Sequence, residues 1–168
     1  TACAHSFTSI GYATETTGPN KSGWWAKIAS LKVHWQYADA QAVIRFLDNS
    51  SGRHNPMRGE LTARIKQQNP MGQDPVGSLF ISDFVTVTEN DFKLIEVTNN
   101  AQLTDYELWV KINYDYTVMC FDLVMCSGDV TIFKDQKLQQ NPPGGRQIAC
   151  SKIVNTSIDR KSTRLNSS

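Results

Sequence analysis

The chain lacks the features that would place it in several broad classes of protein. No apolar run approaches the ~20 residues that a membrane-spanning helix needs. Its 17 basic and 16 acidic residues leave a net charge of only +1. A chain with so balanced a charge has no general attraction to nucleic acid or to an anionic membrane. We therefore expect no nucleic-acid partner and no membrane insertion.

Motifs of catalysis are also missing. The sequence contains no Gly-x-Ser-x-Gly elbow, no P-loop and no dinucleotide-binding fingerprint. A glycosidase needs two carboxylates that face each other across a cleft, and the candidates are scattered along the chain: Asp83, Glu89, Asp91, Asp105, Glu107 and Asp122. Asp122 interrupts an apolar segment, where a buried carboxylate needs a partner. We expect a structural role for it, and neither enzymatic activity nor a cofactor for the chain.

The chain has four cysteines, and they have no metal-site spacing. No close CxxC or HxxxH pair is present, so we expect no zinc site. Cys120 and Cys126 fall in one predicted strand, where six residues span about 20 Å, which is too far for a disulfide. Their even spacing predicts that both point to the same face as small buried side chains. Cys3 and Cys150 could pair if the chain ends meet, whereas free thiols would fit a reducing cytoplasm.

A series of short strands with alternating apolar and polar residues fills most of the chain. The first and longest, 24–36, places Trp25, Leu31 and Trp35 on one face and Ile28 and His34 on the other. Further strands are predicted at 42–47, 57–67, 76–84, 90–98, 106–112, 118–126, 129–135 and 147–154. The inward faces of three of them are Ala42, Ile44 and Phe46; Gly59, Leu61, Ala63 and Ile65; and Tyr106, Leu108, Val110 and Ile112.

This pattern predicts an all-β fold, an antiparallel β-sandwich or jelly roll, with a single barrel as the main alternative. Residues 1–23 are polar and form a connector, and residues 24–155 form the β-sandwich. Residues 156–168 have no strand period and resemble a translated sequencing adapter, so we set them apart as a disordered tail. The opening residues do not form a signal peptide, and the missing initial Met suggests a fragment of a longer protein.

The order of several strand signatures resembles a known family. These signatures are Trp25-Ala-Lys-Ile-Ala29, Gly59-Glu-Leu-Thr-Ala-Arg-Ile65, a Phe-containing strand from Phe92 to Asn100, Leu108-Trp-Val-Lys111, and Tyr114-Asp-Tyr116. Together they resemble the C-terminal head domains of tail-fibre and minor tail proteins of phages and prophages from gut bacteria, over residues 20–150. The resemblance implies a β-sandwich at a fibre tip, often a homotrimer, that binds host-surface glycan in the virion tail after assembly in the bacterial cytoplasm. It carries over no binding residue.

The candidate ligand-binding residues come from the side chains themselves. Arg53, His54 and Asn55 form a polar loop whose groups suit sugar hydroxyls or phosphates. Trp24 breaks the alternation at the start of its strand, and Tyr114 and Tyr116 flank Asp115 in a turn. An exposed aromatic ring can stack on a sugar, while a buried one anchors the core, the role we expect for Trp35. Each candidate also has a structural reading, as a solvated turn or a packed aromatic.

Three functions remain open at this point. The first is a non-catalytic, glycan-binding head domain of a tail fibre. The second is a carbohydrate-binding module or a glycan-active enzyme domain. The third is a purely structural β-domain of a virion or surface protein.

Overall fold

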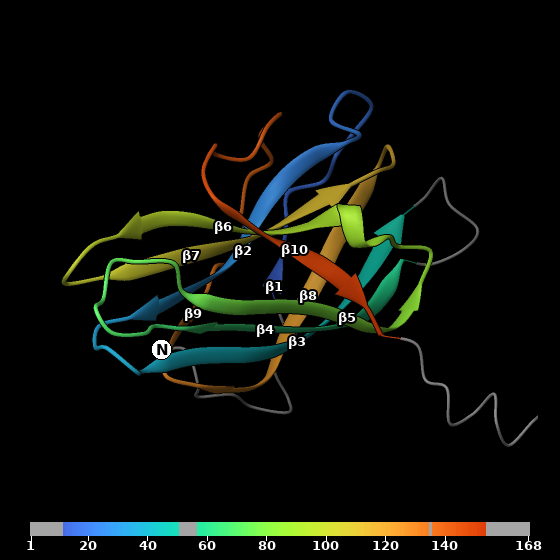
Figure 1. The fold of residues 1–168 in the computed structure, drawn as a ribbon. Coiled ribbons are helices and arrows are strands. Elements are labelled where there is room, and N and C mark those ends of the chain that lie inside the picture. Colours follow the sequence, from blue (N-terminus) through green and yellow to red (C-terminus); the bar gives the residue numbers. More distant parts are fainter. Residues whose placement is uncertain (1–11, 51–56, 135, 154–168) are drawn as a thin grey trace, which may run out of the picture.

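The computed structural model describes residues 12–50, 57–134 and 136–153, except for the side chain of Asp83. These residues form an all-β structure, as predicted, with one short 3-10 helix (Figure 1). The elements are β1 Tyr12–Ala13, β2 Trp24–Val33, β3 Asp39–Ser50, β4 Arg58–Lys66, β5 Val76–Val85, η1 Glu89–Asp91, β6 Phe92–Asn99, β7 Thr104–Ile112, β8 Thr117–Ser127, β9 Asp129–Ile132 and β10 Gln147–Lys152. This part of the chain contains no helix of the length and apolarity that crossing a bilayer requires.

The strands form one curled sheet in the order β1-β8-β3-β4-β5-β10-β6-β7-β2-β9. Neighbouring strands are antiparallel within each of its two halves, β8-β3-β4-β5 and β6-β7-β2-β9. The two halves face each other across the core. β10 joins them, because it pairs in parallel with β5 and antiparallel with β6 (Figure 1). The sheet is therefore a curled half-barrel, and the finer expectation of a sandwich or jelly roll is not confirmed.

Segments outside the main strands bridge the open side of the curl. β1 pairs with β8 through Tyr12 and Phe121, so the end of the expected polar connector adds to the sheet. Thr14 then pairs with Gln136 and Trp25 with Gln139 through isolated β-bridges. These contacts connect β8 to β2 at the side opposite β10. Residues 1–11 and 154–168 lie outside the described residues, so the expected tail is not tested.

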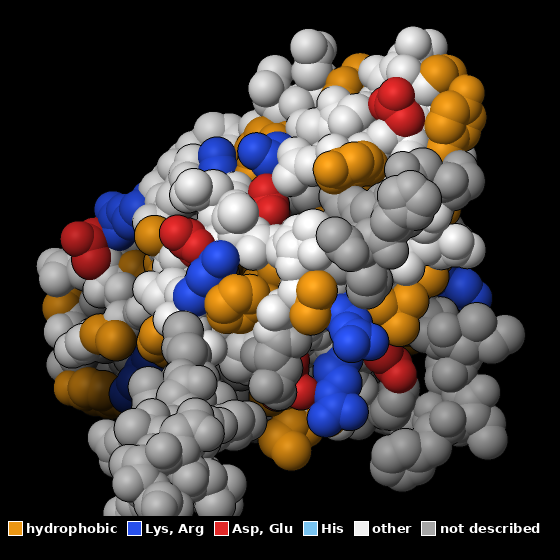
Figure 2. All heavy atoms as spheres, turned by 90° about the vertical axis from the view of Figure 1, so that its right-hand side faces the viewer, with side chains coloured by type: hydrophobic (Ala, Val, Ile, Leu, Met, Phe, Trp, Pro, Cys, Tyr) orange, Lys and Arg blue, Asp and Glu red, His pale blue; other side chains and the backbone are white. Residues whose placement is uncertain are grey.

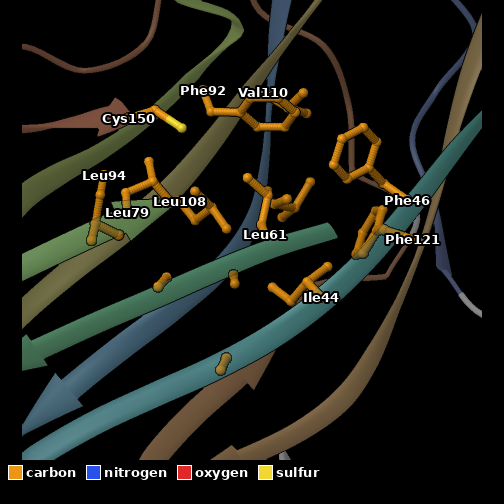
Figure 3. Close-up of a cluster of buried hydrophobic side chains, with 14 of the residues drawn as sticks. Ile44, Phe46, Leu61, Leu79, Phe92, Leu94, Leu108, Val110, Phe121 and Cys150 are labelled. Carbon is orange, nitrogen blue, oxygen red and sulfur yellow. The ribbon is translucent and has the colours of Figure 1, made fainter. Parts of the chain in front are cut away.

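The core lies between the two halves and is built from the alternation that the sequence predicts. Ala42, Ile44 and Phe46 of β3 are at most 4% exposed, and the predicted inward residues of β4 and β7 are buried as well, except Gly59, which is half-buried. Side chains from both halves meet there (Figure 3), and the Phe46 and Phe92 rings lie 5.0 Å apart between centroids. Burying one such large apolar side chain stabilises a fold by about 1.5–3 kcal/mol, so this shared core holds the curl closed.

A β-bulge in β2 changes the faces predicted for the opening strand. The register with β7 shifts between Lys27 and Ala29, which leaves Ile28 as an extra residue. A bulge of one residue exchanges the two faces of the strand beyond it. Trp25 therefore packs outside the main core, with Ile95 and Trp109, whereas Leu31 and Val33 lie inside it. Trp35 lies past the end of β2 and is 76% exposed, so the expected core role for it is wrong.

A second bulge, in β8, separates the cysteines. The register with β3 shifts between Leu123 and Met125. Cys126 beyond the bulge packs against the core, whereas Cys120 before it alternates with the core residues Met119 and Phe121, so the two do not share a face. Cys126 is disulfide-bonded, and Cys120 and Cys150 are free thiols. A pair between Cys3 and Cys150 is therefore excluded.

Candidate functional site

The predicted binding residues that the structure describes lie at one end of the curled sheet. This end, here called the tyrosine end, is made by the connections 17–23, 86–91 and 113–116 and by the facing ends of β3 and β4. β2 begins here and β7 ends here, because Trp24 pairs with Ile112. Arg53, His54 and Asn55 belong to the β3–β4 connection but lie outside the described residues, so their role stays a prediction.

The turn with Tyr114 and Tyr116 is the most exposed aromatic feature of this end. The two side chains are 45% and 55% exposed. Tyr116 has φ 50, a left-handed conformation that is uncommon for a bulky residue and is found where the surroundings fix the backbone. Figure 2 looks onto this end, and hydrophobic side chains gather at its top, at the height of the β7–β8 turn in Figure 1.

Hydrogen bonds from the 14–18 segment hold this turn in place. The Thr17 hydroxyl donates to the Tyr114 carbonyl oxygen (2.5 Å) and accepts from the Thr117 amide (2.9 Å). The Tyr116 amide donates to the Gly18 carbonyl oxygen (2.9 Å). The Thr117 hydroxyl lies 2.9 Å from that of Ser50 and donates to the Asp115 carbonyl oxygen (3.1 Å). The tyrosines are thus presented on a fixed backbone, as rigid recognition loops require.

Trp24 lies beside this turn but is only partly exposed. It packs against the core, and the Lys21 ammonium group stands 5.5 Å from its ring centroid. Lys21 also binds the Glu15 carboxylate at 2.6 Å. This hydrogen bond, together with that from the Leu138 amide, lowers the pKa of Glu15. Trp24 therefore fits both interpretations made from the sequence, core anchor and exposed ring, since one part of it packs against the core and another reaches the surface.

Five of the six carboxylates considered for catalysis have structural partners, and the side chain of the sixth, Asp83, lies outside the described residues. Asp91 is buried and accepts hydrogen bonds from the Thr88 amide (2.9 Å) and the Asn113 side chain (2.7 Å). Asp105 accepts from Ser30, Glu107 pairs with Lys27, Glu89 pairs with Lys152, and Asp122 lies opposite Arg45 in the register. Among the described residues, no group of three or more acidic, His or Cys side chains could hold a metal ion.

The opposite end of the sheet carries an exposed aromatic pair, although the sequence analysis assigned Trp35 to the core and did not consider Tyr37 as a binding residue. Trp35 and Tyr37 in the β2–β3 connection are 76% and 59% exposed, and Tyr37 has φ 64. Lys66 donates to the Tyr37 carbonyl oxygen (3.0 Å), and His34 lies 2.7 Å from Asp129. Their exposure could have been predicted from the sequence, because the polar residues His34, Gln36 and Asp39 around these aromatics indicate a loop rather than a strand.

A small hollow on the outer surface does not belong to either aromatic end. It has a volume of about 220 Å³ and is lined by Gln41, Val43, Thr62 and Met125, beside the bulge of β8. Pockets for small organic ligands usually measure about 300–1,000 Å³. The aromatic ends therefore remain the better candidates for binding.

Comparisons with known proteins assign no family to the chain. No protein-family model matches it, and no curated protein matches it. Among solved structures, it is similar to WceF of Pantoea stewartii, described as a glycan biofilm modifying enzyme with a bacteriophage tailspike-like parallel β-helix fold. The identity is 10% and the TM-score 0.47, over 88% of this chain. The match spans 23% of the WceF chain.

Proposed function

We propose that this chain is a non-catalytic head domain of a phage or prophage tail fibre, which binds host-surface glycan through its tyrosine end. In this proposal residues 24–155 form the head, its two facing half-sheets act as the layers of a sandwich, and three copies assemble in the virion tail. The observation that carries the binding role is the fixed turn with Tyr114 and Tyr116 beside Trp24. Its support in the sequence is the series of strand signatures.

Aromatic rings on a fixed turn suit the binding of sugars. A tyrosine offers an apolar face for the C–H side of a pyranose and a hydroxyl for hydrogen bonds. Little conformational entropy is lost on binding when the backbone is already fixed. The Lys21 ammonium group, 5.5 Å from the Trp24 ring centroid, and Asp115, between the two tyrosines in the sequence, add polar groups of both signs to this end. Glycan binding without catalysis is therefore the function that best suits this end.

The test is glycan binding by the full chain, with variants at the two ends. A panel of bacterial surface polysaccharides is probed with the wild type, with Tyr114→Ala/Tyr116→Ala, and with Trp35→Ala/Tyr37→Ala as the matched control. Each double variant removes two exposed aromatic rings from one end. We expect loss of binding in the first variant only. The reverse pattern would move the site to the Trp35 end, and a wild type that binds no glycan would contradict the proposal.

Two further measurements separate the alternatives. Shortening of a bound polysaccharide by the purified chain would favour the glycan-active enzyme. Glycan binding by a chain that stays monomeric at high concentration in analytical ultracentrifugation would favour a carbohydrate-binding module over a trimeric fibre head. No glycan binding in either state would leave the structural β-domain.

A further inference from the structure

Two lysines stand over a tryptophan on the outer surface next to the tyrosine end. The ammonium groups of Lys93 and Lys111 lie 4.9 and 5.7 Å from the centroid of the Trp25 ring. The three residues come from the adjacent strands β6, β7 and β2, and Lys111 lies directly opposite Trp25 in the register. Three strands of the sheet thus bring two positive charges over one aromatic ring.

The side chains beneath these charges are well packed. Trp25 is 7% exposed and forms a separate buried cluster with Ile95 and Trp109, outside the main core. Lysine stems that cover such apolar surface keep their charged ends in water, and the attraction between ammonium and ring limits where those ends can go. The two ammonium groups are therefore positioned before any ligand arrives.

Within the described part of the chain, these two lysines differ from their neighbours because they form no ion pair with an acidic residue. Lys27 pairs with Glu107 (3.4 Å), Lys21 with Glu15 (2.6 Å) and Lys152 with Glu89 (3.6 Å). Among the residues that the structure describes, no ion pair joins Lys93 or Lys111 to a carboxylate. The chain carries almost as many acidic as basic residues, so two neighbouring lysines that form no ion pair with a described carboxylate make a local positive patch.

The patch is continuous with the tyrosine end. Lys111 precedes Ile112, which pairs with Trp24, and the turn with Tyr114 and Tyr116 follows at once. Lys93 follows η1, whose Asp91 accepts a hydrogen bond from Asn113 at the start of the same turn. A saccharide chain lying on the tyrosines can therefore extend over both lysines.

We infer that the glycan bound at the tyrosine end is acidic, and that Lys93 and Lys111 bind its acid groups. This inference rests on the proposed function. Ammonium groups form charge-assisted hydrogen bonds with carboxylate and phosphate oxygens, and pre-positioned ones lose less entropy in doing so. The tyrosines supply contact with the sugar ring, and the lysine pair selects sugars that carry a negative charge.

The experiment compares an acidic probe with its neutral counterpart. Polygalacturonate oligosaccharides carry one carboxylate on each sugar, and their methyl esters carry none. Binding of both probes to the full chain is measured by calorimetry at low and at moderate salt. We expect the wild type to prefer the acidic probe by about tenfold or more at low salt, since each charge-assisted contact is among the stronger polar contacts, and to lose that preference as salt rises.

Variants assign the preference to these lysines. Lys93→Gln/Lys111→Gln is expected to lose the preference and to bind the acidic and the neutral probe with similar affinity. Lys32→Gln/Lys66→Gln, which loses the same charge elsewhere, keeps the preference. Lys93→Arg/Lys111→Arg also keeps it, and equal urea midpoints of all variants show that folding is intact.

Two results would overturn the inference. One is a wild type that binds both probes equally or fails to bind polygalacturonate at low salt. The other is a preference that survives Lys93→Gln/Lys111→Gln or falls as much in the control pair. Failure of the proposed function looks different, because Tyr114→Ala/Tyr116→Ala would then leave glycan binding intact or no glycan would bind at all.

Discussion

The turn between β8 and β9 allows a sharp test of the curled sheet, because it carries the chain from one half to the other. Its single linking residue, Gly128, has φ +79. A Cβ atom there would lie 2.4 Å from the Asp39 carbonyl oxygen and 2.9 Å from the Ala40 Cα, both in the backbone of β3. A contact of 3.4–4 Å is ordinary, so an added methyl group would force the turn away from β3.

Two other glycines allow the steric and the conformational contributions to the free-energy cost of Gly128→Ala to be measured separately. Gly18 has φ +55 but nothing within 4 Å of an added Cβ, and Gly144 has free space and no positive φ. Left-handed backbone costs an alanine about 1–2 kcal/mol, and the reduced entropy of the unfolded chain offsets about 0.4–1 kcal/mol of it. We expect Gly144→Ala to be neutral or slightly stabilising, and Gly18→Ala to destabilise by about 1 kcal/mol.

Gly128→Ala adds the steric term to the conformational one. Overpacking against a fixed neighbour costs about 1–3 kcal/mol, so the total is expected at about 2–4 kcal/mol. The assay is urea unfolding of the full chain, where a slope of about 2 kcal/mol/M converts this into a midpoint lower by roughly 1–2 M. Equal midpoints for Gly128→Ala and Gly18→Ala would refute the close approach of the β8–β9 turn to β3, and with it this closure of the curl.

Two further predictions concern buried groups. Burial, reinforced by the hydrogen bond to Glu96 (2.8 Å), raises the pKa of the Tyr106 hydroxyl. As pH rises above about 10, the unfolded state therefore loses this proton before the folded state does, and the stability of the fold falls. Tyr106→Phe should be less stable than wild type by about 1–2 kcal/mol at pH 7. In urea unfolding, its stability should fall less steeply than that of wild type at alkaline pH. Burial raises the pKa of both free thiols, that of Cys150 to about 11. Because Cys150 is buried and Cys120 only half-buried, iodoacetamide at pH 8 should label Cys120 faster than Cys150 in the native state, as read by peptide mass spectrometry. Native labelling of Cys150 as fast as that of Cys120 would contradict its burial.

The strands were predictable because their alternation is regular and their loops are rich in turn residues. In β3, β4 and β7 the predicted inward residues face the core and all but Gly59 are buried, since an uninterrupted strand keeps its faces over its whole length. The faces of β2 and β8 were not predictable beyond Ile28 and Val124. A bulge adds one residue of ordinary type, and nothing in Ile28 or Val124 distinguishes it from its β-branched and aliphatic neighbours.

The arrangement of the candidate site depends on contacts between distant parts of the chain. The sequence singled out Trp24, Tyr114 and Tyr116 one by one, but their position at a common end follows from the pairing of β2 with β7. The exposure of Trp35 was missed because its strand ends at Val33. The lysine pair over Trp25 also could not be foreseen, because the β2 bulge decides on which side of the sheet Trp25 lies.

Glycan binding by the two aromatic-end variants tests the central claim most directly. The measurement is the affinity of the full chain for a bacterial surface polysaccharide, in wild type, Tyr114→Ala/Tyr116→Ala and Trp35→Ala/Tyr37→Ala. Stacking on exposed rings predicts at least about tenfold weaker binding in the Tyr114→Ala/Tyr116→Ala variant, and an affinity within about twofold of wild type in the control. Unchanged binding after loss of Tyr114 and Tyr116 would contradict the account.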